Sequence, residues 1–312
     1  MRSRFRTVET AAVTAVCLFV ASAIHATGAF TFQLDPPNGT TCTQAFKVIT
    51  NVNIAGKNAT DVVQGKARLL INRTPQGFTF TFTPLADTLS RQSELVSGDA
   101  AAALRRLMQD VVVTYSVDSG GKLLSVHGLE TAVQNLRRMI GGSGPAISGE
   151  MLAAAEAAEV ARARAMWDRD IAAYVGRTAK IGDVWSDTCP VNLLGVGVVP
   201  AYTKTKFVKA VKVGEEDCVK VRRSYSAKAS SLKSVLNKLI APALSQCPEG
   251  VKPRLVSAQI SGTSESLLHP RTMLYLNESE VCSIKLTLDV PGRGKMTISA
   301  SEKKYGSYQY DE

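Results

Sequence analysis

The stretch Phe78-Thr-Phe-Thr-Phe-Thr83 decides the fold class, because phenylalanine and threonine alternate along all of it. In a β-strand, this alternation places the three phenylalanines on one face and the threonines on the other. Residues 67–72 alternate between apolar and polar in a similar way. A strand with one apolar and one polar face is typical of an antiparallel sheet that packs on one side. Residues 30–83 are therefore predicted to form such strands.

Helical and strand patterns follow each other along the rest of the chain. A hairpin is expected over 112–126, because Asp118-Ser-Gly-Gly121 supplies a tight turn between two apolar stretches. The expected helices cover 98–110, 129–140, about 149–175 and 230–244. The expected later strands cover 201–213, 217–226, 253–266, 271–289 and 294–310. This order predicts an α+β fold with a large curved antiparallel sheet packed on several amphipathic helices, and not alternating βαβ units.

The first residues are typical of an export signal. Arg2, Arg4 and Arg6 precede an apolar run over 11–24, and small residues follow. We expect residues 1–29 to be a signal peptide and the protein to be exported, to the extracellular space, a periplasm or a secretory lumen. Residues 30–312 are then expected to form a single α+β domain, with two similar halves at about 30–180 and 181–312.

Cysteine usage follows from this expectation, since exported proteins can form disulfides. Cys282 is expected to face the core beside Ile284 and Leu286 as a free thiol. The remaining candidates for disulfide pairing, with connectivity left open, are Cys42, Cys189, Cys218 and Cys247. No CxxC spacing occurs, so no metal site is predicted.

The chain is basic, with 37 Lys and Arg against 27 Asp and Glu and a formal net charge of +10. Basic residues gather in 204–238. The candidates there for contact with an anionic surface, such as a lipid or polysaccharide, are Lys204, Lys206, Lys212, Lys220 and Arg222. The alternative is a solvated face of the sheet. No basic-aromatic motif is present, so nucleic acid is not an expected partner.

The sequence offers little to catalysis. Outside the expected signal peptide, histidine occurs only at His127 and His269, and neither lies in a nucleophile motif. Ser230-x-x-Lys233 has the SxxK spacing but lacks the partner motifs of that chemistry. We therefore assign no catalytic residue and no cofactor.

Three segments resemble an uncharacterised family of exported bacterial proteins, many of them lipoproteins. The segments are Val117-Asp118-Ser-Gly120-Gly-Lys-Leu-Leu-Ser-Val126-His-Gly128, Gly182-Asp183-Val-Trp185, and the stretch from Gly262 to Leu274. The lipidation cysteine frequent in that family is missing here. The resemblance implies a curved sheet similar to half-barrel periplasmic carriers that hold acyl chains.

These observations favour a secreted or periplasmic, non-enzymatic carrier of a hydrophobic or amphipathic ligand, such as a lipid, with the oligomeric state left open. The residues expected to face the ligand are Trp167, Ile171 and Tyr174 on the long helix and Phe78, Phe80 and Phe82 on the strand. An extracellular structural or interaction protein with a filled core is one alternative, and a hydrolase without a recognisable motif is another. A cavity beneath the helix would favour the carrier, and clustered buried carboxylates would favour the hydrolase.

Overall fold

The computed structural model describes residues 29–54, 56–94, 102, 111–140, 149–192, 198–227, 229–233, 236, 253–292 and 294–311. Three predictions fall wholly or mostly outside these residues: the signal peptide over 1–29, the helix over 98–110 and the pairing of Cys247. Of the helix predicted over 230–244, residues 230–233 and 236 are described and are helical.

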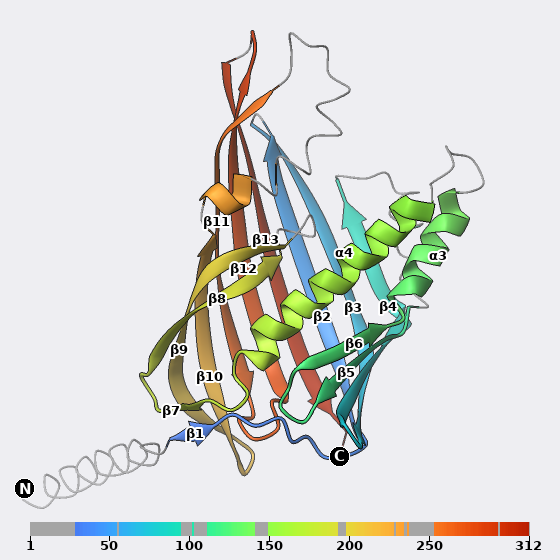
Figure 1. Ribbon diagram of the computed structural model, residues 1–312, viewed down its shortest axis with the longest axis vertical. Helices are drawn as coiled ribbons and strands as arrows, with labels where there is room; N and C mark the ends of the chain where they lie inside the picture. Colours follow the sequence, from blue (N-terminus) through green and yellow to red (C-terminus); the bar gives the residue numbers. More distant parts are fainter. Residues whose placement is uncertain are drawn as a thin grey trace, which may run out of the picture.

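One curved antiparallel sheet dominates the described chain (Figure 1). Its eleven strands lie in the spatial order β6-β5-β4-β3-β2-β13-β12-β11-β10-β9-β8. In chain order they are β2 (Thr40–Ile54), β3 (Lys57–Thr74), β4 (Gly77–Ser93), β5 (Val113–Asp118), β6 (Leu123–His127), β8 (Val184–Asn192), β9 (Val198–Val213), β10 (Glu216–Ala227), β11 (Arg254–Leu268), β12 (Tyr275–Val290) and β13 (Gly294–Tyr310). The two halves of the chain thus meet where β2 pairs with β13.

The helices lie on the concave face of the sheet (Figure 1). Helix α3 (Leu129–Ile140) has the predicted bounds, and α4 (Gly149–Trp167) continues into a π-helical turn, η1 (Asp168–Ala172). Helix α4 contacts both edge strands, β6 and β8. The prediction of an α+β fold with several packed helices needs correction, because the described chain is mostly β. Its central strands run for 12 to 18 residues, and the long helix lies across them.

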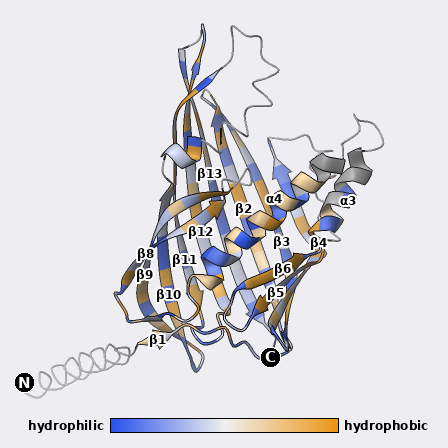
Figure 2. Cartoon of the chain, in the orientation of Figure 1, coloured by the Kyte–Doolittle hydropathy of each residue, from blue (hydrophilic) through white to orange (hydrophobic). Residues whose placement is uncertain are grey.

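Strand register sorts side chains onto two faces, and hydropathy changes sign repeatedly along the strands (Figure 2). The concave face carries two apolar clusters. The first lies under α4 and includes Phe80, Trp167 and Phe207, and the second includes Ile260 and Ile284. A row of polar and charged side chains separates them: Arg223, Ser264, Glu280 and Lys304 are successive cross-strand neighbours from β10 to β13.

The segment that follows Ala29 closes one end of the curved sheet (Figure 1). Strand β1 (Phe30–Thr31) pairs with β7 (Thr178–Ala179). Phe32 then donates its backbone N–H to the carbonyl of Arg177 at 2.8 Å, and its fully buried ring packs on Tyr174 and Phe207. This end of the first apolar cluster is therefore sealed from solvent.

The expected disulfides are not present among the described cysteines. Cys42, Cys189, Cys218 and Cys282 are all free and buried. They lie on β2, β8, β10 and β12, and no two of these strands are neighbours. Strands two positions apart are separated by about 9.6 Å, whereas a disulfide needs Cα atoms within about 7 Å. Pro190 follows Cys189 directly, but β8 continues through both residues.

Candidate functional site

A cavity of about 370 Å³ lies between α4, η1 and the concave face. Its volume falls within the range of about 300–1,000 Å³ typical of small-molecule sites. The lining strands run from β5 and β4 across β3, β2 and β13 to β12, and Met273 and Leu274 before β12 complete it. Strands β4 and β12 are four strand spacings apart, or about 19 Å. The cavity is therefore elongated across the strands.

Most of the cavity wall is apolar and aromatic. The ring of Trp167 meets that of Phe80 edge to face at 5.1 Å and stacks on that of Tyr115 at 5.9 Å. The indole N–H of Trp167 donates to the carbonyl of Gly121 at 2.8 Å, so its one polar group is already satisfied. The other apolar lining side chains are Leu69, Ile71, Phe82, Val113, Ala163, Met166, Ile171, Met273 and Leu274. The end of the cavity beside β4 and β5, where the rings of Phe80, Tyr115 and Trp167 meet, suits a hydrocarbon group.

Four of the six residues predicted to face a ligand line this cavity: Trp167, Ile171, Phe80 and Phe82. The other two do not. Phe78 lies farther along β4, with the Arg73 guanidinium 5.0 Å from its ring centre. Tyr174 packs against Phe32 and Trp185. The reason is the π-helical turn: Ala173 donates its N–H to Asp168 at 2.9 Å, which breaks the α-helical spacing on which the shared face of Trp167 and Tyr174 depended.

The end of the cavity beside β12 and β13 is polar. Gln44 Nε2 donates to the hydroxyl of Tyr308 at 2.9 Å, and this hydroxyl donates to Glu278 Oε1 at 2.8 Å. The hydroxyl of Tyr275 donates to the carbonyl of Asp170 at 2.5 Å, and that of Tyr310 to the carbonyl of Tyr275 at 2.8 Å. All three tyrosine hydroxyl protons are thus directed to acceptors of the protein itself.

An ion-pair network adjoins this polar end. Arg169 bonds both carboxylate oxygens of Asp170, at 2.7 and 2.8 Å, and also Glu280 at 2.8 Å. Arg223 bonds Asp170 at 2.9 Å. Both arginines are almost fully buried, with exposures of 6% and 2%. Burial alone would raise the pKa of Asp170, but the two arginines outweigh it and lower this pKa. Asp170 is therefore ionised and paired.

Glu278 has a different environment from the paired carboxylates. It forms no ion pair with any residue in the described ranges. Its pKa is raised, mainly by burial and also by the negative charges of Asp170 and Glu280. The Tyr308 hydroxyl and Arg169 lower this pKa, but they do not outweigh burial. The side chain of Glu278 lies over Gly306, where an added Cβ would come within 2.8 Å of it. Glu278 is thus a carboxylate at the cavity with no cation beside it.

The sequence interpretation missed this network. Neither Arg169 nor Arg223 was singled out. An uninterrupted α-helix would place Arg169 on a different face from Trp167 and Ile171. The sequence of β10 contains a usable signal, because Arg223 shares the buried face of the strand with Val221 and Tyr225. An arginine in an inward-facing position indicates a buried acidic partner.

The basic residues proposed for an anionic surface do not form an uninterrupted patch. Lys220 bonds Glu265 at 2.6 Å, and Arg222 bonds the same carboxylate. Lys212 lies 4.0 Å from Asp217. Lys204 and Lys206 are exposed on β9. An anionic partner stays a prediction.

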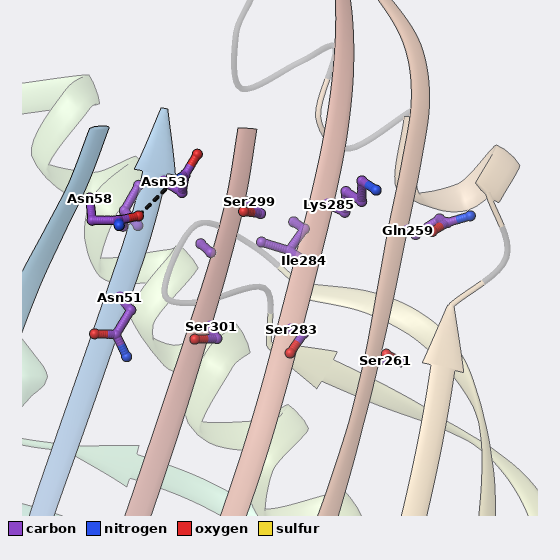
Figure 3. Close-up of a pocket in the computed structure, with 12 residues that line it drawn as sticks. Asn51, Asn53, Asn58, Gln259, Ser261, Ser283, Ile284, Lys285, Ser299 and Ser301 are labelled. Carbon is purple, nitrogen blue, oxygen red and sulfur yellow. Dashed lines mark hydrogen bonds between the residues drawn. The ribbon is translucent and has the colours of Figure 1, made fainter. Parts of the chain in front are cut away.

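The opposite face of the sheet carries a second depression, of about 350 Å³ (Figure 3). Its rim is a cross-strand row of Ser261, Ser283, Ser301 and Asn51. Among the described residues that line it, Lys285 alone is charged and none is aromatic, so the cavity under α4 is the better candidate site.

In the part of the chain that the structure describes, no three His, Cys, Asp or Glu side chains come together in a way that could hold a metal ion. No helix there is both long and apolar enough to cross a membrane.

Comparison with known proteins adds little. No family model matches the chain and no curated protein matches it, so the resemblance to an exported bacterial family gains no support. Among solved structures, the chain is similar to lipovitellin, in a structure that concerns its lipid–protein interactions, with a TM-score of 0.44 and 9% identity. The match covers 88% of this chain and 26% of that chain. It is also similar to OccK2 (OpdF) of Pseudomonas aeruginosa, solved with glucuronate, with a TM-score of 0.21, 9% identity, and coverage of 89% of this chain and 100% of that one. For an outer membrane channel of Pseudomonas putida F1 the TM-score is 0.18 at 8% identity, with 89% and 98% covered. The chain spans about a quarter of the lipovitellin chain, and these TM-scores are too low for any of the three to bear on function.

Proposed function

We propose that this protein binds and carries a hydrophobic or amphipathic molecule in the cavity under α4, after export from the cell. The observation that carries this proposal is the cavity itself, with its aromatic wall at one end and its polar groups at the other. The cavity has a volume of about 370 Å³ and spans about 19 Å of sheet between β4 and β12. A space of this shape suits a single extended hydrocarbon chain with a polar head.

Access to the cavity supports reversible binding. Met166 lines the cavity and is 39% exposed, so the cavity approaches solvent beside the last turn of α4. A filled core, as in the structural or interaction protein considered above, would leave no such space. The carrier is therefore the preferred function.

A matched pair of substitutions tests the proposal. Ala163 lines the cavity from α4, whereas Ala161 is exposed on the same helix. Leucine has nearly the same helix propensity as alanine, so Ala163→Leu fills the cavity and Ala161→Leu leaves it open. Binding of Nile red would be followed by its fluorescence and by that of Trp167 in a Trp185→Phe background. We expect Ala163→Leu to weaken binding and Ala161→Leu to leave it unchanged; absence of binding by the parent protein would refute the carrier.

A hydrolase is the second candidate, because Asp170 and Glu278 both border the cavity. Both oxygens of Asp170 are bonded by Arg169, which leaves Glu278 as the carboxylate free for proton transfer. Most acid–base hydrolysis of glycosides requires two such groups. Turnover of nitrophenyl glycosides or esters that is abolished by Glu278→Gln would favour this candidate over the carrier.

A further inference from the structure

The hydrogen-bonding groups that the cavity leaves open are mainly acceptors. The hydroxyl protons of Tyr275, Tyr308 and Tyr310 all go to acceptors within the protein. What remains toward the cavity is the second oxygen of Glu278, lone pairs of these hydroxyls, and the amide of Gln44, which carries a second N–H besides the one donated to Tyr308. Acceptors therefore outnumber donors at this end, and a head group that donates hydrogen bonds is the better match.

The charges near this end lead to the same requirement. Arg169 and Arg223 point at Asp170 and Glu280, and neither arginine lines the cavity. Lys304 lies beside Glu280 and Glu302, at 3.8 and 2.9 Å. The cations of the network are thus committed to other carboxylates, and Glu278 has no cation partner in the part of the chain described. A carboxylate buried without a partner is costly, and a positively charged ligand group would supply that partner.

We propose that the polar end of the cavity selects single-chain amphiphiles with a cationic, hydrogen-bond-donating head, such as a long-chain primary amine, over those with a carboxylate head. This inference rests on the proposed carrier function. In this arrangement the ammonium group donates to Glu278, and the hydrocarbon chain runs across β13, β2 and β3 toward Phe82 and Trp167. A carboxylate head in the same place would face two other carboxylates, Glu278 and Asp170, and the nearby tyrosine hydroxyl protons are already engaged.

Three ligands with the same chain and different heads test the selectivity: dodecylamine, dodecanol and dodecanoate. Each would displace Nile red at pH 8 and below its critical micelle concentration. We expect dodecylamine to bind most tightly, dodecanol next and dodecanoate most weakly. Hydrogen bonds to charged groups are stronger than those between neutral groups, so we expect the Kd of dodecanol to exceed that of dodecylamine roughly tenfold or more.

Two isosteric variants test whether the charge of Glu278 causes the head-group selectivity. Glu278→Gln removes the charge at the cavity, and we expect it to reduce dodecylamine affinity roughly tenfold or more while improving that of dodecanoate. Glu265→Gln is the matched control, because Glu265 lies on the opposite face of β11, next to the residue paired with Glu278. It removes the same charge from the protein without touching the cavity, and should leave all three affinities unchanged. Thermal unfolding of both variants checks that they fold.

The outcomes separate the inference from the function on which it rests. Equal binding of the three ligands, tighter binding of dodecanoate, or an equal effect of the two variants would overturn the selectivity while the carrier function stands. Failure of all three ligands and of Nile red to bind would overturn both.

Discussion

Arg222 and Arg223 are adjacent in the sequence and point to opposite faces of the sheet, so they provide a matched test of the buried network. Arg223 is 2% exposed, bonds Asp170 at 2.9 Å and the carbonyl of Arg169, and lies 4.9 Å from the ring centre of Tyr174. The side chain of Arg222 is 57% exposed and bonds Glu265. Replacing each by methionine removes the charge and keeps most of the hydrocarbon stem.

The two substitutions should lower the free energy of unfolding by amounts that differ several-fold. Removing one partner of a buried ion pair typically costs about 3–5 kcal/mol. Two features place Arg223→Met near the lower limit: Asp170 keeps both bonds to Arg169, and the Nε of Arg223 is itself buried without a hydrogen-bond partner among the described residues. We therefore expect a loss of about 3 kcal/mol. Arg222→Met removes a solvent-screened pair whose carboxylate retains Lys220, and should cost about 0–1 kcal/mol.

Urea unfolding followed by circular dichroism measures both free energies, provided that the slope with urea is the same in the two variants. Repeating it in high salt adds a second criterion. Salt should remove any effect of Arg222→Met and leave that of Arg223→Met, because buried pairs are screened much less than exposed ones. A loss for Arg223→Met within about 1 kcal/mol of that for Arg222→Met would refute the buried network.

Three further predictions concern the concave face. Gly262→Ala should destabilise the protein by about 1–3 kcal/mol, since its Cβ would lie 2.2 Å from the ring of Tyr225 and displace the hydroxyl that donates to Glu280; unchanged urea unfolding would contradict this. Because burial raises the pKa of Glu278 above its ordinary 4.5, the folded state holds that proton more tightly, and the free energy of unfolding should fall as pH rises from 4.5 through the folded pKa. Glu278→Gln should flatten that slope, and an unaltered slope would argue against the assignment. Burial also raises the pKa of the Cys42 thiol to about 11, so a thiol reagent at pH 8 should label it only after unfolding, whereas labelling of the native protein would show that it is accessible.

The sequence was informative where the signal is local and periodic. The alternation over Phe78–Thr83 identified β4, and the turn at Asp118–Gly121 identified the β5–β6 hairpin. Strand β8 was missed because Val184–Asn192 contains Pro190 and shows no clear alternation. Its position explains why the proline is tolerated: β8 is an edge strand, where a missing N–H interrupts no ladder.

The two halves of the candidate site also differ in whether the sequence could predict them. Its apolar half was accessible to prediction, since Trp167, Ile171, Phe80 and Phe82 each belong to a periodic apolar pattern. Its polar half was not, because Gln44 and Tyr308 meet only through the pairing of β2 with β13, across a separation of 264 residues. No local pattern contains that pairing, and the α+β interpretation did not specify a strand order.

The π-helical turn connects the stability of the fold with the polarity of the cavity. By breaking the α-helical spacing after Trp167, it allows the successive residues Arg169 and Asp170 to join one network with β10 and β12. Such buried pairs add little net stability, and their better-attested effect is to fix one arrangement of the parts that carry them. Here they hold η1 against the sheet while committing the two arginines to Asp170 and Glu280. The same pairing therefore leaves Glu278 as the carboxylate open to a ligand, so the contacts that fix the cover of the cavity also determine which head group the cavity can accept.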